Sequence, residues 1–264
     1  MILPFLGSRL PIDQDELDWQ LATYKWMIGE FGPVAGRPLV LPSPQYFPAS
    51  TRKGHERVED LFGQVKRLAG MSDWPCRLEP GRADRPTTAG NALLIRHHGA
   101  PAPCGTFRDA GDDGIVITYN PSLAGDTNAM IATFAHEFGH YLMSKARSAP
   151  PGGWALHELH TDLVAVGLGF GIFLANSARN FSQFQDATEM GWSSRTQGYL
   201  SEGALTTGLA IFQRLAGRDP LEAGPWLKPY LQSDLKRATK GLARRFPDLE
   251  TAVEATDLSE FAGG

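Results

Sequence analysis

The chain of 264 residues has few cysteines and no segment typical of export. Its two cysteines, Cys76 and Cys104, are too few for the disulfide framework of a small secreted protein, so we expect a reducing, cytoplasmic environment. The N-terminal residues lack the basic region and the long apolar run of a secretory signal. The most apolar run, 163–175, is too short to span a membrane and contains three glycines. We therefore expect no membrane partner.

The sequence also lacks an excess of positive charge. It has 25 Lys and Arg against 29 Asp and Glu, a formal net charge of −4, which does not favour a nucleic acid as partner. The one basic stretch, 236–245, is interrupted by apolar residues at helical spacing, and we interpret it as the solvated face of a helix. With 42% hydrophobic and 20% charged residues, the composition is that of an ordinary soluble globular protein.

The periodicity of the chain changes along its length and predicts an α+β fold. Apolar residues at helical spacing predict helices over 13–31 and 53–69, joined by an irregular segment rich in proline and glycine. Short β-forming segments then predict a small sheet with strands at 92–96, 105–108 and 115–119. The rest of the chain predicts helices at 127–145, 156–176, 201–217, 226–246 and 249–261.

This order divides the chain into an N-terminal α+β part, 1–125, with a small mixed sheet, and a helical part, 126–264. We expect the two parts to form one compact catalytic unit, with the helix 127–145 between the sheet and the helical half.

That helix carries the segment His136-Glu137-Phe138-Gly139-His140, an H-E-x-x-H motif. Residues four apart on a helix differ by about 40° in direction and about 6 Å along the axis, so both imidazoles can reach one metal ion. Glu137 lies about 100° from His136 and would stand beside the metal, within reach of a water molecule. The pattern predicts a zinc site with Glu137 as general base.

A catalytic zinc ion usually has three protein ligands, so a third is needed. Glu158 and Asp162 are four residues apart on the next predicted helix, on a face that continues through the small residues Ala165 and Gly169. We assign Glu158 as the third ligand, and Asp162 as the acceptor that fixes the orientation of a ligand histidine. His157 and His160 lie off this face and remain the alternatives as third ligand.

The motif followed by Glu158-x-x-x-Asp162 resembles the gluzincins, the thermolysin-like branch of the zincin metallopeptidases. The resemblance covers about residues 115–162. It implies a zincin-like fold, zinc ligated by His136, His140 and Glu158, Glu137 as the base, and Asp162 as the residue that orients a histidine. Zincins align an extended substrate on the edge strand of a small sheet, and the resemblance implies this use for the strand 115–119.

Two further groups of residues are candidates. Polarising a substrate carbonyl needs another donor, and Tyr199 and Arg195 lie just before the next predicted helix. Cys76 and Cys104, with the histidine pair 97–98, could instead form a structural zinc site, although their spacing matches no compact ligand pair.

The sequence thus predicts a zinc-dependent metallohydrolase, in first place a peptidase that acts on peptides or proteins. One alternative is a binding or regulatory protein that keeps the zincin fold without turnover. Another is a metallohydrolase that acts on a non-peptide amide. The presence of Glu137 favours an enzyme, because a purely structural zinc ion needs no base.

Overall fold

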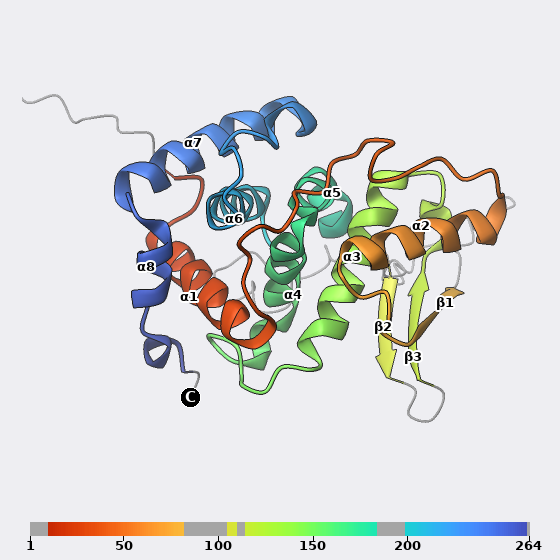
Figure 1. Ribbon diagram of the computed structural model, residues 1–264, viewed down its shortest axis with the longest axis horizontal. Helices are drawn as coiled ribbons and strands as arrows, with labels where there is room; N and C mark the ends of the chain where they lie inside the picture. The colour runs from red at the N-terminus through yellow and green to blue at the C-terminus, as the bar shows by residue number, and fades with distance from the viewer. Residues whose placement is uncertain (1–9, 82–104, 110–113, 184–198, 263–264) are drawn as a thin grey trace, which may run out of the picture.

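The computed structural model describes residues 10–81, 105–109, 114–183 and 199–262. Within these residues the protein is a mixed α+β structure in which a small sheet lies at one end and helices fill the rest (Figure 1). The helices are α1 (Gln14–Phe31), α2 (Gly54–Leu68), α3 (Thr127–Met143), α4 (His157–Ala165), α5 (Gly171–Gln183), α6 (Glu202–Leu215), α7 (Pro229–Arg245) and α8 (Leu249–Ala255).

The described sheet has the order β1-β3-β2, with β1 (Cys76–Pro80), β2 (Gly105–Asp109) and β3 (Ile115–Tyr119). β1 pairs with β3 in parallel and β2 pairs with it antiparallel. The strands predicted at 105–108 and 115–119 are therefore confirmed, whereas the one predicted at 92–96 lies outside the described residues. β1 was missed because the proline at its end, a second proline just before it and two charged residues within it give this short segment a weak β pattern.

The placement of β3 corrects one expectation. The strand 115–119 was expected at the sheet edge, where an extended substrate could pair with it, but β3 is bonded on both sides along its whole length. Its backbone groups are already used, so it cannot take a further strand. Among the described strands, β2 is the edge strand on the side of α3, the helix that carries the motif (Figure 1).

Helix α3 lies between the sheet and the helical half of the molecule. It contacts α2, β2 and β3 on one side and α4 and α5 on the other, as Figure 1 shows. Asp126 immediately precedes the helix and is its N-cap, because its carboxylate accepts the Ala129 N–H at 3.0 Å. Because both sides are covered, even its polar residues Thr133, His136 and Glu137 are buried.

The helix predicted over 156–176 is divided in two. A wide turn at Val166–Phe170 separates α4 from α5, and Gly169 within it has φ of +100°. Its carbonyl accepts the Val40 N–H at 3.0 Å, and a side chain at 169 would collide with the Pro38 carbonyl oxygen. Gly169 therefore lets the segment 38–40 pass close to the helix. It does not bring α4 close to α3, although it lies on the same predicted helix face as Glu158.

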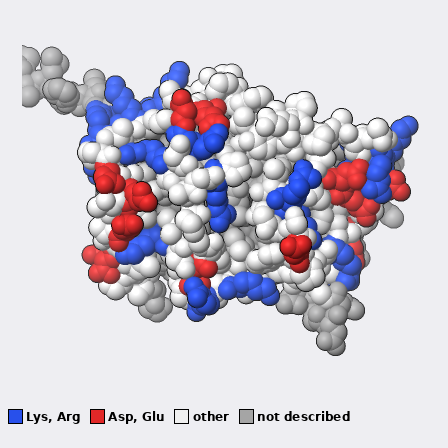
Figure 2. Space-filling view, viewed as in Figure 1, with Lys and Arg blue, Asp and Glu red and all other residues white. Residues whose placement is uncertain are grey.

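Burial also explains the apolar and the basic stretches of the C-terminal half. Within the described residues, one helical run, Trp154–Ala178, is long and apolar enough to cross a membrane, and 94% of its apolar window is buried inside the protein. It is a core element. On α7 the basic residues are exposed, whereas its leucines and Ala238 are buried, as expected for a helix with one solvated face. Figure 2 shows basic side chains over α7 and mixed charges elsewhere on that face.

The close approach of α3 and α4 depends on Gly139, the small residue inside the motif. A Cβ atom there would lie 2.9 Å from the Thr161 carbonyl oxygen and 3.0 Å from Thr161 Cγ2. The first distance is shorter than real Cβ contacts, and the second is tighter than most of them. The glycine therefore lets the backbones of the two helices come nearly into contact.

Replacing Gly139 by alanine should lower the free energy of unfolding by about 1–3 kcal/mol, because the added methyl group overpacks a backbone contact. Gly63→Ala is the matched control, since Gly63 is an exposed helical residue of α2 with open space around it. It should raise the stability by about 0.5–1 kcal/mol. Denaturant titration of both variants measures these changes. A Gly139→Ala variant as stable as the wild type would show that the contact is not tight.

Candidate metal centre

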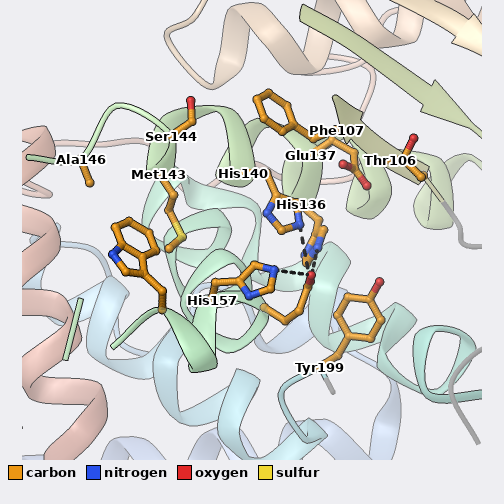
Figure 3. A pocket seen from close by; sticks show the side chains of 13 residues that line it. Thr106, Phe107, His136, Glu137, His140, Met143, Ser144, Ala146, His157 and Tyr199 are labelled. Atoms are coloured by element: carbon orange, nitrogen blue, oxygen red, sulfur yellow. Dashed lines mark hydrogen bonds and ion pairs between the residues drawn. The ribbon is translucent and has the colours of Figure 1, made fainter. Parts of the chain in front are cut away.

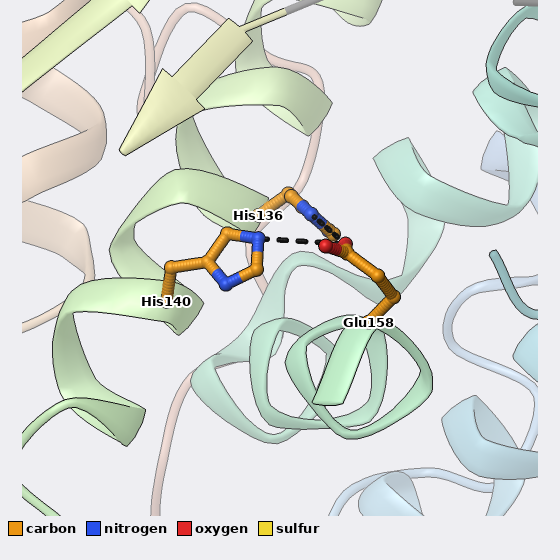
Figure 4. Close-up of side chains that lie close together, drawn as sticks. All are labelled: His136, His140 and Glu158. Atoms are coloured by element: carbon orange, nitrogen blue, oxygen red, sulfur yellow. Dashed lines mark hydrogen bonds and ion pairs between the residues drawn. The ribbon is translucent and has the colours of Figure 1, made fainter. Parts of the chain in front are cut away.

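Three side chains from two helices converge on one point. His136 and His140 come from α3 and Glu158 from α4, and one potential ligand atom from each lies within 4.8 Å of the others (Figure 4). Glu158 Oε2 is 3.1 Å from His136 Nε2 and 3.4 Å from His140 Nε2. One carboxylate oxygen thus faces both imidazoles.

The other nitrogen of each ring is held by a neighbour on α4. His136 Nδ1 lies 2.9 Å from Asp162 Oδ1, to which it donates. The Thr161 hydroxyl donates to the His157 carbonyl at 2.7 Å, so it is free to accept from His140 Nδ1 at 3.2 Å. Both rings therefore present Nε2 to the common point, and a histidine that keeps a proton on Nδ1 in this way can offer the Nε2 lone pair to a metal ion.

The arrangement fits a tetrahedral metal ion. Two donor atoms that each lie about 2.0–2.1 Å from a tetrahedral zinc ion are about 3.3–3.4 Å apart. The distances of 3.1 and 3.4 Å between Glu158 Oε2 and the two ring nitrogens are close to this value. Two imidazoles and one carboxylate are a donor set for zinc and for other first-row divalent ions. These residues could hold a metal ion, and the donor set alone does not identify it.

Without a metal ion, burial and mutual hydrogen bonds set the pKa values of His136, His140 and Glu158. Burial alone would lower the pKa of His136, but its hydrogen bonds with Asp162 and Glu158 outweigh this effect and raise it to about 10. Burial also opposes ionisation of Glu158, yet its bonds with His136 and His140 hold its pKa well below the usual range. Burial lowers the pKa of His140, against the raising effect of its bond with Glu158.

Glu137 is the one carboxyl group of this region that has an oxygen without a partner. Its side chain is buried, and Oε2 accepts no hydrogen bond from the described residues. Burial raises its pKa to about 7, with a further contribution from the charge of Glu158, while His136 lowers it. Gly105 of β2 leaves room for this carboxylate, because a Cβ atom at 105 would lie 2.8 Å from Glu137 Oε1. A buried oxygen with no partner in the protein is expected to meet a ligand or water.

Asp162 joins the motif helix to the segment before α6. Its Oδ1 accepts from His136, and its Oδ2 accepts the Leu200 backbone N–H at 2.8 Å. The neighbouring Tyr199 is thereby held beside the site, with its ring centroid 5.1 Å from that of His136. Figure 3 shows Tyr199 on one side of the metal-binding group and His157 on the other.

The site opens into a cleft of about 780 Å³. Residues 105–107 of β2 form part of its wall, and the ring of Phe107 is stacked 6.4 Å from that of His140. The cleft contains His136, His140, Glu137 and Glu158, and it extends past His157 to the end of α3. A substrate group can therefore approach the candidate metal position from outside.

The two alternative third ligands, His160 and His157, do not direct a ring nitrogen at the point that Glu158 Oε2 shares with His136 and His140. Both nitrogens of the buried His160 face backbone carbonyls, of Leu156 at 2.8 Å and Pro151 at 2.9 Å. His157 is half exposed, and its Nε2 lies 3.0 Å from the outer oxygen of Glu158, Oε1. His157 therefore touches the carboxylate from outside.

Several other sequence candidates lie outside the described residues, namely Arg195, His97, His98 and Cys104. Cys76 is half-buried in β1, and burial raises the pKa of its thiol. Nothing among the described residues joins it to a metal-binding group.

Sequence reasoning missed three residues of the site, Thr161, Gly105 and Trp154. Thr161 could have been found, because it is three residues after Glu158 and so shares its helix face with Asp162. Gly105 and Trp154 line the site only through the tertiary fold, and no local pattern in the sequence points to them.

Comparison of the chain with protein-family models, with curated proteins and with solved structures found no match.

The purified chain should bind one divalent metal ion, and Glu158→Ala should weaken zinc binding by far more than 100-fold, since it removes a ligand. His157→Ala should lose about 10–100-fold at most, the usual effect of a residue that touches a ligand from outside. Competition titrations with a zinc chelator measure both affinities. The reverse order would show that His157 is the ligand.

Asp162→Asn should lower zinc affinity by about 10–100-fold. Asparagine has one side-chain oxygen, so it can accept from His136 or from Leu200 in the present geometry but its amide nitrogen cannot accept from the other. The same chelator titration measures the loss, and unchanged affinity would mean that His136 needs no acceptor on Nδ1. Thermal unfolding in the absence of metal serves as the folding control.

Proposed function

We propose that this protein is a zinc-dependent metallohydrolase with a zincin-type site, and that it cleaves amide bonds in peptides or proteins. One observation carries the proposal. The buried Glu137 oxygen, which has no hydrogen-bond partner among the described residues, lies in the same cleft as two imidazoles and a carboxylate that can share a metal ion. A structural metal site would be closed and would need no such group.

The ligands would be His136, His140 and Glu158. When bound, zinc supplies Lewis acidity, which favours both the ionisation of water and attack on a carbonyl group. The chain's own part is then proton transfer. Glu137 would accept a proton from the attacking water and later deliver it to the leaving amine, and Gly105 leaves its carboxylate the space to do so.

Tyr199 would stabilise the developing charge on the substrate oxygen. It lines the cleft across from the α3 residues, and its neighbour Leu200 is fixed by the bond to Asp162. A phenolic O–H held at such a position can donate to an oxyanion. The role of Asp162 would accordingly be double, since it orients both His136 and the segment that carries Tyr199.

An extended peptide substrate would lie along β2. Residues 105–107 of this strand line the cleft beside Glu137 and His140, and β2 runs antiparallel to β3. Main-chain pairing with a strand gives affinity with little dependence on sequence. This replaces the strand 115–119 as the candidate for substrate alignment.

Glu137→Gln should keep zinc and the fold but reduce hydrolysis by about 10²–10⁴-fold, the usual effect of losing a positioned base. Glutamine matches glutamate in size, but its amide cannot take the proton from water. Cleavage of a peptide library by the wild type and the variant, read by mass spectrometry, measures the loss. Zinc content and melting temperature should stay at the wild-type values.

Three other outcomes would count against the proposal in different ways. Full activity of Glu137→Gln would show that another group is the base. Loss of zinc in the variant would show that Glu137 is a ligand. If neither protein cleaves the library while both hold zinc, a binding protein of zincin-like fold or a hydrolase of non-peptide amides takes its place.

A further inference from the structure

One large apolar side chain of the described protein remains exposed inside the cleft. Trp154 has 49% of its surface exposed and lines the same cleft as the candidate metal ligands. The other exposed large hydrophobic residues among the described ones, Leu221, Trp226 and Tyr230, do not line it. An exposed tryptophan in a cleft is apolar surface that a ligand can cover with a gain in free energy.

The backbone that carries Trp154 is firmly attached to the core. The preceding Gly152 donates its N–H to the Phe261 carbonyl at 2.6 Å, and the Pro151 carbonyl accepts from the Trp19 indole at 3.1 Å. The same carbonyl lies 2.9 Å from His160 Nε2. The turn Trp154–Leu156 then leads directly into α4. The indole therefore has a fixed base on the turn that leads into α4, the helix that carries Glu158.

The surroundings of Trp154 are mainly apolar and uncharged. Met143 and Ala146, at and after the end of α3, line the same cleft and lie away from Thr106 and Tyr199, as Figure 3 shows. The two basic residues on either side of Ala146 in the sequence have contacts of their own. Lys145 lies over the Tyr141 ring at 5.7 Å, and Arg147 pairs with Glu30 at 3.4 Å.

The charged groups of the cleft are gathered at its other end. Among its described lining residues, the carboxylates are Glu137 and Glu158, both at the candidate metal position, and there is no lysine or arginine. His157 stands between the two ends, with its Nε2 against Glu158. Among the described residues, the Trp154 end thus offers no carboxylate for a cationic group and no cation for an anionic one.

We propose that Trp154, Met143 and Ala146 form a subsite for a bulky apolar or aromatic side chain of the substrate. This inference rests on the proposed function and narrows its substrate class to chains with such a residue near the cleaved bond. The aromatic face of Trp154 could also attract a cation, but no carboxylate at this end of the cleft supports that choice.

The test uses three hydroxamates, which chelate zinc through the same group and differ in the attached tail. Acetohydroxamate does not reach Trp154, 3-phenylpropionohydroxamate carries an aromatic tail, and 6-aminohexanohydroxamate carries a cationic one. Their dissociation constants are measured by calorimetry on the zinc-loaded wild type, on Trp154→Ala, and on Trp226→Ala as the matched control. Trp226 is 38% exposed and does not line the cleft.

The wild type should bind the phenyl compound about 10-fold more tightly than acetohydroxamate, as expected for covering part of an indole. Trp154→Ala should reduce this ratio to about 3-fold or less, and Trp226→Ala should leave it unchanged. Since Trp154 is half exposed, the variant is expected to fold, and its melting temperature checks this.

Ala146→Asp is a second variant that does not depend on losing the indole. It places a carboxylate at this end of the cleft, so it should weaken the phenyl compound and strengthen the amino compound relative to acetohydroxamate. Agreement of both variants would establish the subsite.

The outcomes separate this inference from the proposed function. An unchanged ratio in Trp154→Ala while all three compounds bind would overturn the subsite and leave the metal centre in place. Tighter binding of the amino compound than of the phenyl compound by the wild type would show a cationic specificity instead. If no hydroxamate binds any zinc-loaded variant, the metallohydrolase proposal fails and the subsite fails with it.

Discussion

The backbone contact between Gly139 and Thr161 sets the spacing of α3 and α4, and the candidate metal centre depends on that spacing. With the helices this close, Glu158 reaches both motif histidines, and Thr161 and Asp162 reach their outer nitrogens. All three α4 residues lie on one helix face, so a single helix–helix distance positions them together. A wider separation would break every one of these contacts at once.

Burying so many ionisable groups is costly unless each is compensated. The atoms that face outward are paired within the protein: Asp162 with His136 and Leu200, and Glu158 Oε1 with His157. The inward atoms, Glu158 Oε2 and the two Nε2 nitrogens, face one another. A divalent cation satisfies such a set better than a proton, which can join only two of the three atoms. Metal binding would thus also stabilise the fold.

The parts of this structure that follow from local pattern could be predicted from the sequence. The position of α3 and the common face of His136 and His140 follow from helical periodicity. Glu158 was predicted from its place on the next helix, but its meeting with the histidines depends on the packing of α4 against α3. The sheet order could not be predicted, because pairing between β1 and β3 joins residues about forty apart, such as Cys76 and Ile115. For the same reason, the contribution of Gly105 and Trp154 to the cleft became visible only in the folded chain.

The position of Tyr119 in the sheet has a consequence for how this chain can vary in length. Pro80 at the end of β1 and Gly105 at the start of β2 both pair with Tyr119, one on each side of β3. Two strand spacings place these residues about 10 Å apart, so the chain leaves the sheet and returns to it at nearly the same place. Closing a loop costs only about 0.6 kcal/mol more for each doubling of its length. Insertions between these two residues would therefore cost little stability, so evolution or an engineer could vary the length of this connection while α3 and α4 keep the metal position.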